Sequence, residues 1–379
     1  MLLAVGVALI AGGISLSEYS RRHPGEKKKT DDKTKDGGKK AEPAAAPLPT
    51  LDELTSHHNY VYEAPSADDV STAGKHFEEL AAAAKPLANS TATTVLGGAL
   101  NARTLVKAGD GVALWVEQSA PTKTQSRMFS LVWLGSSSKV LVTGRANVGP
   151  IASDGKRIVW AEQGRILSVT LDAPLVKGVT EFGKANVTAL AVDGDDIIAM
   201  LSPSQLDPFS TEPASALVKF GADRNVKTLA SGLVRPQDVA LSSMRALFIS
   251  GYPSSLQVVN LDGTDLHALS DRAEPPLLTH DDKAIFRHAS DTGGGLVQAN
   301  IGGGEPTRVA QGDIEKASID GEHFIYALGA AVHLQQGAKD ESLVELPSTV
   351  LEVAAGAGNA WALTRDDGGQ LVLVKKPFK

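Results

Sequence analysis

Eight polar residues stand at corresponding points of the sequence, a few positions ahead of a short turn that recurs along the chain. They are Asn101, Asn147, Asn186, Gln237, Asp238, Glu274, Glu315 and Glu352. Amide and carboxylate oxygens ligate hard cations such as calcium, and the same groups bind polar ligands through hydrogen bonds. If the fold brings these positions together, they form a polar ring with an acidic bias that could bind a ligand. The alternative is local, because Asn and Asp also favour turns by hydrogen bonding to nearby backbone.

The other residues that could do chemistry give little support for catalysis. The chain has no cysteine, which excludes disulfides, thiolate metal sites and a cysteine nucleophile. The sequence contains neither a Gly-x-Ser-x-Gly nucleophile elbow nor a phosphate-binding loop. A strand predicted between His280 and His288 holds them roughly 26 Å apart, which is too far for one zinc ion. We therefore expect no catalytic residue, no bound metal and no cofactor.

The recurring turn belongs to a repeated unit. The clearest unit spans 150–182 and predicts four short strands, with Asp154-Gly155 at its first turn. Equivalent turn positions are 108, 154, 193, 243, 280, 320 and 356, with spacings of 46, 39, 50, 37, 40 and 36 residues. The longest interval contains a Pro- and Ser-rich insertion at 201–215, which predicts a surface loop. Four strands at this period predict an all-β, seven-bladed β-propeller of four-stranded antiparallel blades.

The two ends of the repeat region complement each other. The last unit stops one strand short, whereas the segment 94–98 precedes the first unit and matches the end of an internal unit at 228–232. An N-terminal strand is therefore predicted to complete the last blade, which would close the ring and leave no open sheet edge between its ends. Six or eight blades remain alternatives, because the first and last units are the weakest. The four tryptophans lie in apolar strand patterns and are expected in the core: Trp115, Trp133, Trp160 and Trp361.

The unit at 150–182 also carries a family resemblance. It reads Asp-Gly-x-x-Ile-Val-Trp from Asp154 and Gly-x-Ile-x-x-x-x-Leu from Gly164. This pattern resembles the broad group of YWTD-, NHL- and TolB-like bacterial β-propeller proteins, over residues 91–379. The resemblance implies the propeller fold, with ligands bound at one end of the central channel near the loops that lead into the innermost strands. It implies no particular activity.

The first 90 residues differ from the repeats. Residues 1–19 contain the apolar segment 1–16, which is typical of a signal peptide or a membrane anchor. Residues 20–50 form a basic, Pro- and Ala-rich linker that we expect to be disordered, with a charge of +5 over 21–40. Basic residues that follow the apolar segment would hold the rest of the chain in the cytoplasm. Export, a cytoplasm-facing anchored protein, and neither of these therefore stay open.

Residues 51–90 predict a helical extension, with a helix at about 68–85 that Ser66 can cap. Five apolar residues fall on one helical face: Val70, Ala73, Phe77, Leu80 and Ala84. We expect this face to pack against the protein's own repeat domain.

These features predict a non-enzymatic β-propeller that binds or scaffolds proteins in the bacterial cell envelope. We expect it to be exported to the periplasm or anchored in the membrane through segment 1–16, with protein partners in the envelope. Nucleic acid is not expected as a partner, because residues 41–379 carry a charge of −11. Two alternatives remain, a calcium-dependent hydrolase of the lactonase or esterase type and a carbohydrate- or cell-wall-binding protein.

Overall fold

The computed structural model describes residues 47–118, 127–172, 175–221, 225–242, 244–289, 294–337 and 339–378. The apolar segment 1–16, most of the basic linker and the turn position Ser243 lie outside these ranges. Within them, no helix combines the length and the apolar character needed to cross a membrane. The described part of the chain is mainly sheet, with two short helices near its start.

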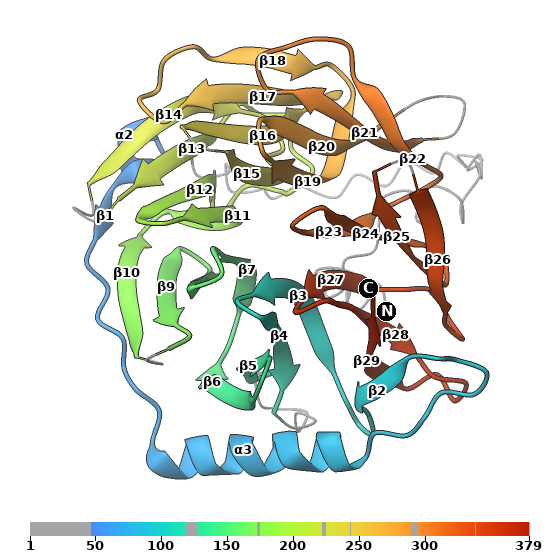
Figure 1. The fold of residues 1–379 in the computed structure, drawn as a ribbon. Coiled ribbons are helices and arrows are strands. Elements are labelled where there is room, and N and C mark those ends of the chain that lie inside the picture. The colour runs from blue at the N-terminus through green and yellow to red at the C-terminus, as the bar shows by residue number, and fades with distance from the viewer. Residues whose placement is uncertain are drawn as a thin grey trace, which may run out of the picture. The chain divides into compact units, whose positions relative to one another are not determined.

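The strands form seven sheets arranged around a central channel (Figure 1). In each sheet, or blade, four strands follow one another from the channel outwards. The innermost strands are β3 (Ala102–Ala108), β7 (Val148–Ser153), β11 (Ala185–Asp193), β15 (Asp238–Ser242), β19 (Ala273–His280), β23 (Lys316–Asp320) and β27 (Glu352–Gly356). The second strands are β4 (Gly111–Glu117), β8 (Arg157–Glu162), β12 (Asp196–Pro203), β16 (Arg245–Gly251), β20 (Lys283–His288), β24 (His323–Leu328) and β28 (Asn359–Arg365).

The third and outermost strands complete the blades, all with antiparallel neighbours. The third strands are β5 (Phe129–Leu134), β9 (Arg165–Thr170), β13 (Ser215–Phe220), β17 (Ser254–Asn260), β21 (Gly295–Asn300), β25 (Ala331–Gln336) and β29 (Leu371–Pro377). The outermost strands are β6 (Ser138–Arg145), β10 (Val176–Phe182), β14 (Val226–Leu233), β18 (His267–Ser270), β22 (Thr307–Gln311), β26 (Lys339–Glu345) and β2 (Thr93–Leu96). We number the blades 1 to 7 by their innermost strands, from β3 to β27. The predicted fold class and the number of blades are confirmed.

The hydrophobic core is divided among the contacts between neighbouring blades. Seven clusters of buried residues each join two adjacent blades, and the last of them joins blade 7 to blade 1. The predicted burial of the tryptophans is confirmed, because each of the four is at most 6% exposed. Trp115 and Trp160 meet edge to face across blades 1 and 2, with ring centroids 5.9 Å apart. Side chains between blades, not a single central core, therefore hold the ring together.

The ring is closed as the sequence predicts. Strand β2, from the N-terminal part of the chain, pairs with β29 in the order β2-β29-β28-β27. Thr93 lies opposite Lys375 and Leu96 opposite Leu373. Leu96 has no solvent exposure and belongs to the cluster between blades 7 and 1. The predicted loop at 201–215 is confirmed over residues 204–214, which connect β12 to β13, whereas residues 201–203 and Ser215 belong to these strands.

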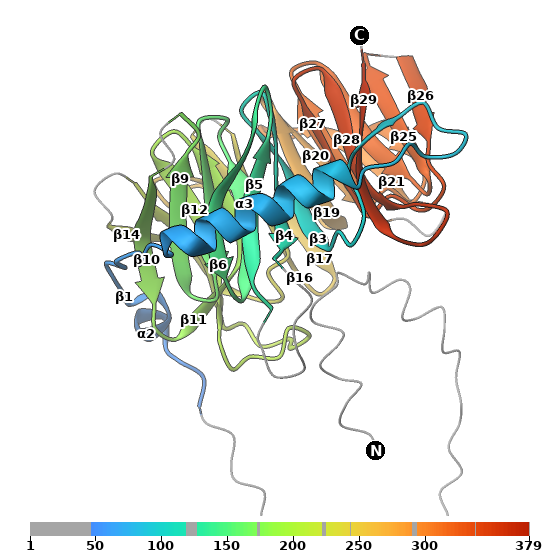
Figure 2. The same cartoon turned by 90° about the horizontal axis from the view of Figure 1, so that it is seen from below.

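The residues ahead of β2 run along the outside of the propeller as a segment we call the N-terminal belt (residues 50–92). It contains α2 (Leu51–Thr55), β1 (His57–His58) and α3 (Ala67–Ala82). Leu54 packs into the cluster between blades 2 and 3, and β1 adds a fifth strand to β10. Figure 2 shows α3 crossing the outer side of the disc near β6.

Helix α3 confirms the predicted helix and its cap. The Ser66 hydroxyl accepts a hydrogen bond from the Asp69 amide, while the Asp69 carboxylate accepts one from the Ser66 amide. Ala73, Phe77 and Leu80 are buried, so the helix packs on its own domain as expected. The prediction for Val70 is wrong, because its side chain is 46% exposed. Residues 67–72 of the helix are all exposed, and Ala73 is its first buried residue.

Docking of the belt against β10 requires a glycine at position 178. A Cβ atom there would lie 1.9 Å from the Tyr60 carbonyl oxygen, which is far closer than any tolerated contact. We expect Gly178→Ala to push the belt off β10, to cost about 1–3 kcal/mol of stability, and to speed limited proteolysis within residues 57–65. Gly183→Ala is the matched control, because a Cβ at Gly183 meets nothing within 4 Å. Equal proteolysis of both variants would contradict this account.

Candidate functional site

The innermost strands all begin on one side of the disc, which we call the top face. The loops that join one blade to the next, and those between second and third strands, lie on this face because the strands alternate in direction. Each predicted ring residue lies at or just before the start of an innermost strand. The repeat therefore places all eight around the same mouth of the channel. Their side chains, however, differ in what they contact.

Blade 5 holds the most connected group at this mouth. The Arg287 guanidinium on β20 pairs with Glu274 at 2.5 Å, directly across the β19–β20 ladder. The same guanidinium pairs with Asp313 at 2.9 Å and lies 3.9 Å from Glu315, both in the link to blade 6. Two predicted ring residues, Glu274 and Glu315, are thus brought together by a cation that the sequence analysis missed. Register could have revealed it, because Arg287 lies opposite Glu274 once the two strands are paired.

The link continues around blades 6 and 7. Lys316, at the start of β23, pairs with Glu352 at the start of β27 at 3.1 Å. Asp238, at the start of β15, accepts hydrogen bonds of 2.9 Å from the amides of Val239 and Leu277. Leu277 belongs to β19, so Asp238 ties blade 4 to blade 5. The mouth from blade 4 to blade 7 is therefore a chain of contacts between blades.

The remaining predicted residues do not join this network. Asn101 donates to the buried Glu117 carboxylate within blade 1, and Gln237 donates to Ser254 Oγ at 2.6 Å within blade 4. Asn147 is exposed and has φ +54°, a turn conformation that Asn tolerates better than most residues. Asn186 is half-buried in β11, opposite Ser202. For Asn147 the geometry matches the turn interpretation.

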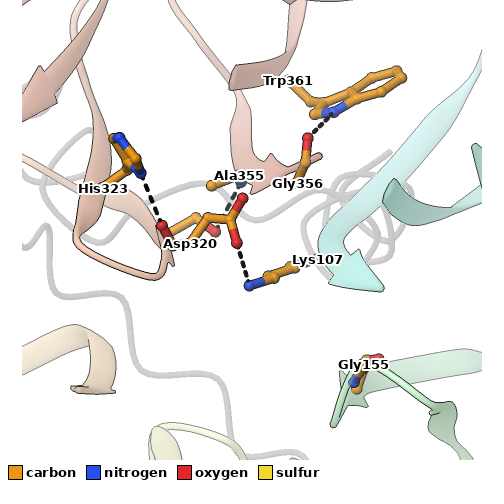
Figure 3. A network of polar contacts seen from close by, with 9 residues as sticks. Lys107, Gly155, Asp320, His323, Ala355, Gly356 and Trp361 are labelled. Atoms are coloured by element: carbon orange, nitrogen blue, oxygen red, sulfur yellow. Dashed lines mark hydrogen bonds and ion pairs between the residues drawn. The ribbon is translucent and has the colours of Figure 1, made fainter. Parts of the chain in front are cut away.

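The opposite, bottom face carries a cross-channel contact near the turns that follow the innermost strands (Figure 3). Lys107 on β3 pairs with Asp320 on β23 at 2.6 Å, which joins blade 1 to blade 6 past the intervening blade 7. Nearby, the Trp361 indole donates to the Gly356 carbonyl at 3.3 Å. The Ala355 amide donates to Ser318 Oγ at 3.0 Å, linking blades 6 and 7. These contacts hold the three blades at the closure of the ring.

The charged side chains at the channel mouth are arranged to link strands and blades by ion pairs, not to ligate a metal ion. Glu274, Asp313 and Glu352 each pair with a cation, so a metal ion would have to displace Arg287 or Lys316 to reach their oxygens. His280 and His288 lie near opposite ends of the β19–β20 hairpin, opposite Lys283 and Ala273 respectively. No group of three or more potential metal ligands occurs within the described ranges.

The pKa of Asp238 lies well above the ordinary value for an aspartate. Burial raises its pKa from 3.8 to about 6, although the Leu277 and Val239 amides and the Lys316 charge act in the opposite direction. A raised pKa means that the folded state binds the proton more tightly than the unfolded state does. This contribution to stability is complete below about pH 4 and is lost as the pH rises through about 6.

We therefore expect the wild-type protein to lose about 1–3 kcal/mol relative to Asp238→Asn between pH 4 and pH 7. Urea unfolding of both proteins at several pH values measures this difference. Asp262→Asn serves as the control, because fully exposed Asp262 has a lowered pKa and should not reproduce the effect. A constant difference between wild type and Asp238→Asn across this range would contradict the expectation.

Comparison with known proteins gives a fold but no family. No protein-family model and no curated protein match the sequence. Among solved structures, the β-propeller domain of the Trilobed protease from Pyrococcus furiosus matches with a TM-score of 0.56 and 10% identity, over 75% of this chain and 95% of that one. The WD40 β-propeller domain of Doa1 matches with a TM-score of 0.51 and 14% identity, over 78% of this chain and 95% of that one.

Peptidases also appear among the matches. Acylaminoacyl peptidase from Pyrococcus horikoshii has a TM-score of 0.55 and 10% identity, and the match covers 74% of this chain but only 52% of the peptidase. This protein thus matches about half of that enzyme. TolB from Acinetobacter baumannii is a more distant match, with a TM-score of 0.42. The seven sheets of the closed ring and the stronger matches show that this chain is a seven-bladed β-propeller. The β-propeller fold is also that of the WD40 domain of Doa1 and of the propeller domain of the Trilobed protease.

Proposed function

We propose that this protein is a non-enzymatic binding or scaffolding module of the bacterial cell envelope, and that protein partners dock on its top face. The observation that carries the proposal is the state of the charged groups at the channel mouth. Arg287 and Lys316 hold Glu274, Asp313 and Glu352 in ion pairs within and between blades. Carboxylates held in such ion pairs stiffen the channel mouth and are poorly placed to activate water or a substrate.

The calcium-dependent hydrolase is weaker for the same reason. Such an enzyme needs several carboxylate or amide oxygens converging on one ion, whereas no three His, Asp or Glu side chains come together in this way within the described ranges. Asn101 and Gln237 also donate to partners within their own blades. We also propose that the protein lies in the cell envelope and that residues 1–19 are a signal peptide or a membrane anchor. Its propeller is, in this proposal, related to the YWTD-, NHL- and TolB-like propellers.

Affinity capture tests the proposal. The full chain and a chain of residues 48–379 are each immobilised and exposed to solubilised native membranes, and bound proteins are identified by mass spectrometry. We expect both to retain the same protein partner, because each keeps the whole top face, while only the full chain fractionates with membranes. Calcium bound at one ion per chain, with ester hydrolysis that a chelator abolishes, would overturn the proposal.

The polar ring has its own test. The triple variant Asn147→Ala, Asn186→Ala, Glu315→Ala removes one predicted ligand group from each of three blades with little change to the core. If the ring contacts the partner, capture falls with the triple variant. Unchanged capture would remove the ring from the binding surface and would leave the loops of the top face as the site.

A further inference from the structure

Two aromatic side chains depart from the burial pattern of the described residues. Phe209 is 58% exposed and Tyr252 is 73% exposed, whereas every other Phe, Tyr and Trp in these ranges is buried or half-buried. Phe209 lies in the insertion between β12 and β13, and Tyr252 lies in the turn between β16 and β17. Both segments connect second to third strands, so both lie on the top face. Isolated exposed apolar side chains are ordinary, but two of the largest gathered at one place are not.

A single arginine brings them together. Arg235, in the link between β14 and β15, donates from Nε to the Phe209 carbonyl at 2.8 Å, and its Nη2 donates to the same oxygen. Its Cζ lies 4.4 Å from the centroid of the Tyr252 ring. We call this group the 209/235/252 corner. It joins blades 3 and 4 on the top face.

These contacts use only one edge of the guanidinium. Nε and one Nη2 proton point to the Phe209 carbonyl, which leaves the outer edge, formed by Nη1 and the second Nη2 proton, with no partner among the described residues. No ion pair of Arg235 occurs in this part of the chain. Two parallel N–H groups on such an edge match the two oxygens of a carboxylate. Stacking on Tyr252 fixes the direction of the edge in advance.

The loop that presents Phe209 is held by its own hydrogen bonds. The Phe209 amide donates to Asp207 Oδ1 at 2.7 Å, and the Ser210 amide donates to the Asp207 carbonyl at 2.9 Å. The Ser204 amide donates to the Lys184 carbonyl at 3.0 Å, which continues the β11–β12 ladder of the same blade into the start of the loop. A loop ordered before binding loses less entropy on association.

We propose that the 209/235/252 corner is the docking site for a protein partner that presents a carboxylate beside an apolar side chain. The carboxylate takes the free edge of Arg235, and the apolar side chain packs on Phe209 and the open face of Tyr252. Tyrosine and arginine are the residue types that dominate binding energy in protein interfaces. This inference rests on the proposed binding function and specifies its site and the chemistry of its partner.

Two other occupants fit the corner less well. An anionic membrane attracts clusters of basic residues, but the exposed neighbours Asp207 and Glu212 are acidic and leave no net positive charge here. A neutral glycan could stack on the open face of Tyr252 but has no carboxylate for the free edge of Arg235. Binding of a carboxylate through two short hydrogen bonds depends more on the local geometry of the donors than on the net charge of the surface.

A random dodecamer peptide library displayed on phage is the probe, panned against the folded full-length chain. We expect the recovered peptides to share an Asp or Glu next to an apolar residue. A synthetic consensus peptide should lose roughly tenfold or more in affinity with Arg235→Gln, Phe209→Ala or Tyr252→Ala. The controls are Arg308→Gln, which removes an exposed arginine on β22, and Leu266→Ala, which removes an apolar side chain that is 51% exposed.

A double-mutant cycle gives the decisive readout. Replacing the peptide's acid by its amide should weaken binding to wild type but hardly change binding to Arg235→Gln, because the two groups act on each other. Peptides without an acidic residue, or equal binding by Arg235→Gln and Arg308→Gln, would overturn the inference. So would binding to anionic vesicles or glycans that depends on Phe209 and Tyr252.

The experiments distinguish failure of the proposed binding function from failure of the proposed site at the 209/235/252 corner. If Arg235→Gln captures the same membrane protein as wild type, the binding function stands and this site is wrong. If the wild-type chain captures no protein, the binding function itself is wrong. Thermal unfolding of each variant near the wild-type midpoint confirms that the exposed substitutions leave the fold intact.

Discussion

A chain that begins at residue 99 is expected to lose its cooperative thermal transition and to aggregate. It lacks strand β2, which leaves the edge of β29 unpaired at the closure of the ring. It also lacks three buried apolar side chains in the cluster between blades 7 and 1, those of Phe77, Leu80 and Leu96. At about 1.5–3 kcal/mol for each, their loss removes roughly 5–9 kcal/mol. This is comparable with the whole stability of a typical domain.

Two comparisons separate ring closure from loss of the belt. A chain of residues 48–379 keeps every described helix and strand, so its melting temperature should stay close to that of the full chain. Leu96→Ala tests the closing strand alone and should cost about 2–5 kcal/mol, whereas Val70→Ala on the exposed side of α3 should cost less than about 0.5 kcal/mol. A soluble, cooperatively folding 99–379 chain would show that the ring does not need β2.

Breaking the ion pair between Arg145 and Glu162 is expected to cost about 3–5 kcal/mol. Arg145 ends β6 of blade 1, Glu162 ends β8 of blade 2, and their side chains are only 13% and 7% exposed. Arg145 Nε donates to Glu162 Oε1 at 2.7 Å, and the Trp160 indole donates to the same oxygen at 2.9 Å. Burial alone would lower the pKa of Arg145, but its interactions with Glu162 and Tyr60 together outweigh burial and raise it. Either single substitution leaves the other charge buried without its partner.

Denaturant unfolding of Arg145→Met, Glu162→Gln and the double variant measures this coupling. The double variant should cost less than the sum of the single variants, because it leaves no unpaired charge. The exposed pair Lys184–Glu53, with side chains 57% and 45% exposed, is the matched control and should contribute far less to stability, because water screens exposed ion pairs. Single variants at Arg145 and Glu162 that cost no more than this control would contradict the prediction.

The sequence contained a partial signal for this buried pair. Trp115 and Trp160 occupy equivalent places in consecutive units, and each is followed two residues later by a glutamate. Both glutamates, Glu117 and Glu162, are buried. A repeated Trp-x-Glu at the end of a core strand could have marked a buried carboxylate in need of a cation. Its partner could not be read in the same way, because Arg145 reaches it from the neighbouring blade.

The 209/235/252 corner likewise consists of residues whose contacts cannot be read from the sequence. The insertion that carries Phe209 was recognised as a surface loop, because its Pro- and Ser-rich composition interrupts a regular period. That Phe209, Arg235 and Tyr252 meet depends on three loops that are separated along the chain and on two blades lying side by side. The belt is similar, since its path past β10 depends on the missing side chain of Gly178.

The strand order within each blade, the strand that closes the ring and a count of about seven blades follow from the sequence alone. These features rest on local signals, namely alternating apolar residues, turn glycines and a period of about forty residues, and each is repeated often enough to be read. Only the tertiary structure decided which polar groups meet at the mouth, where the belt runs and where aromatic side chains stay exposed. The reason is physical: ion pairs and stacked rings form between blades, so their partners are set by the closed ring and not by neighbours in the chain.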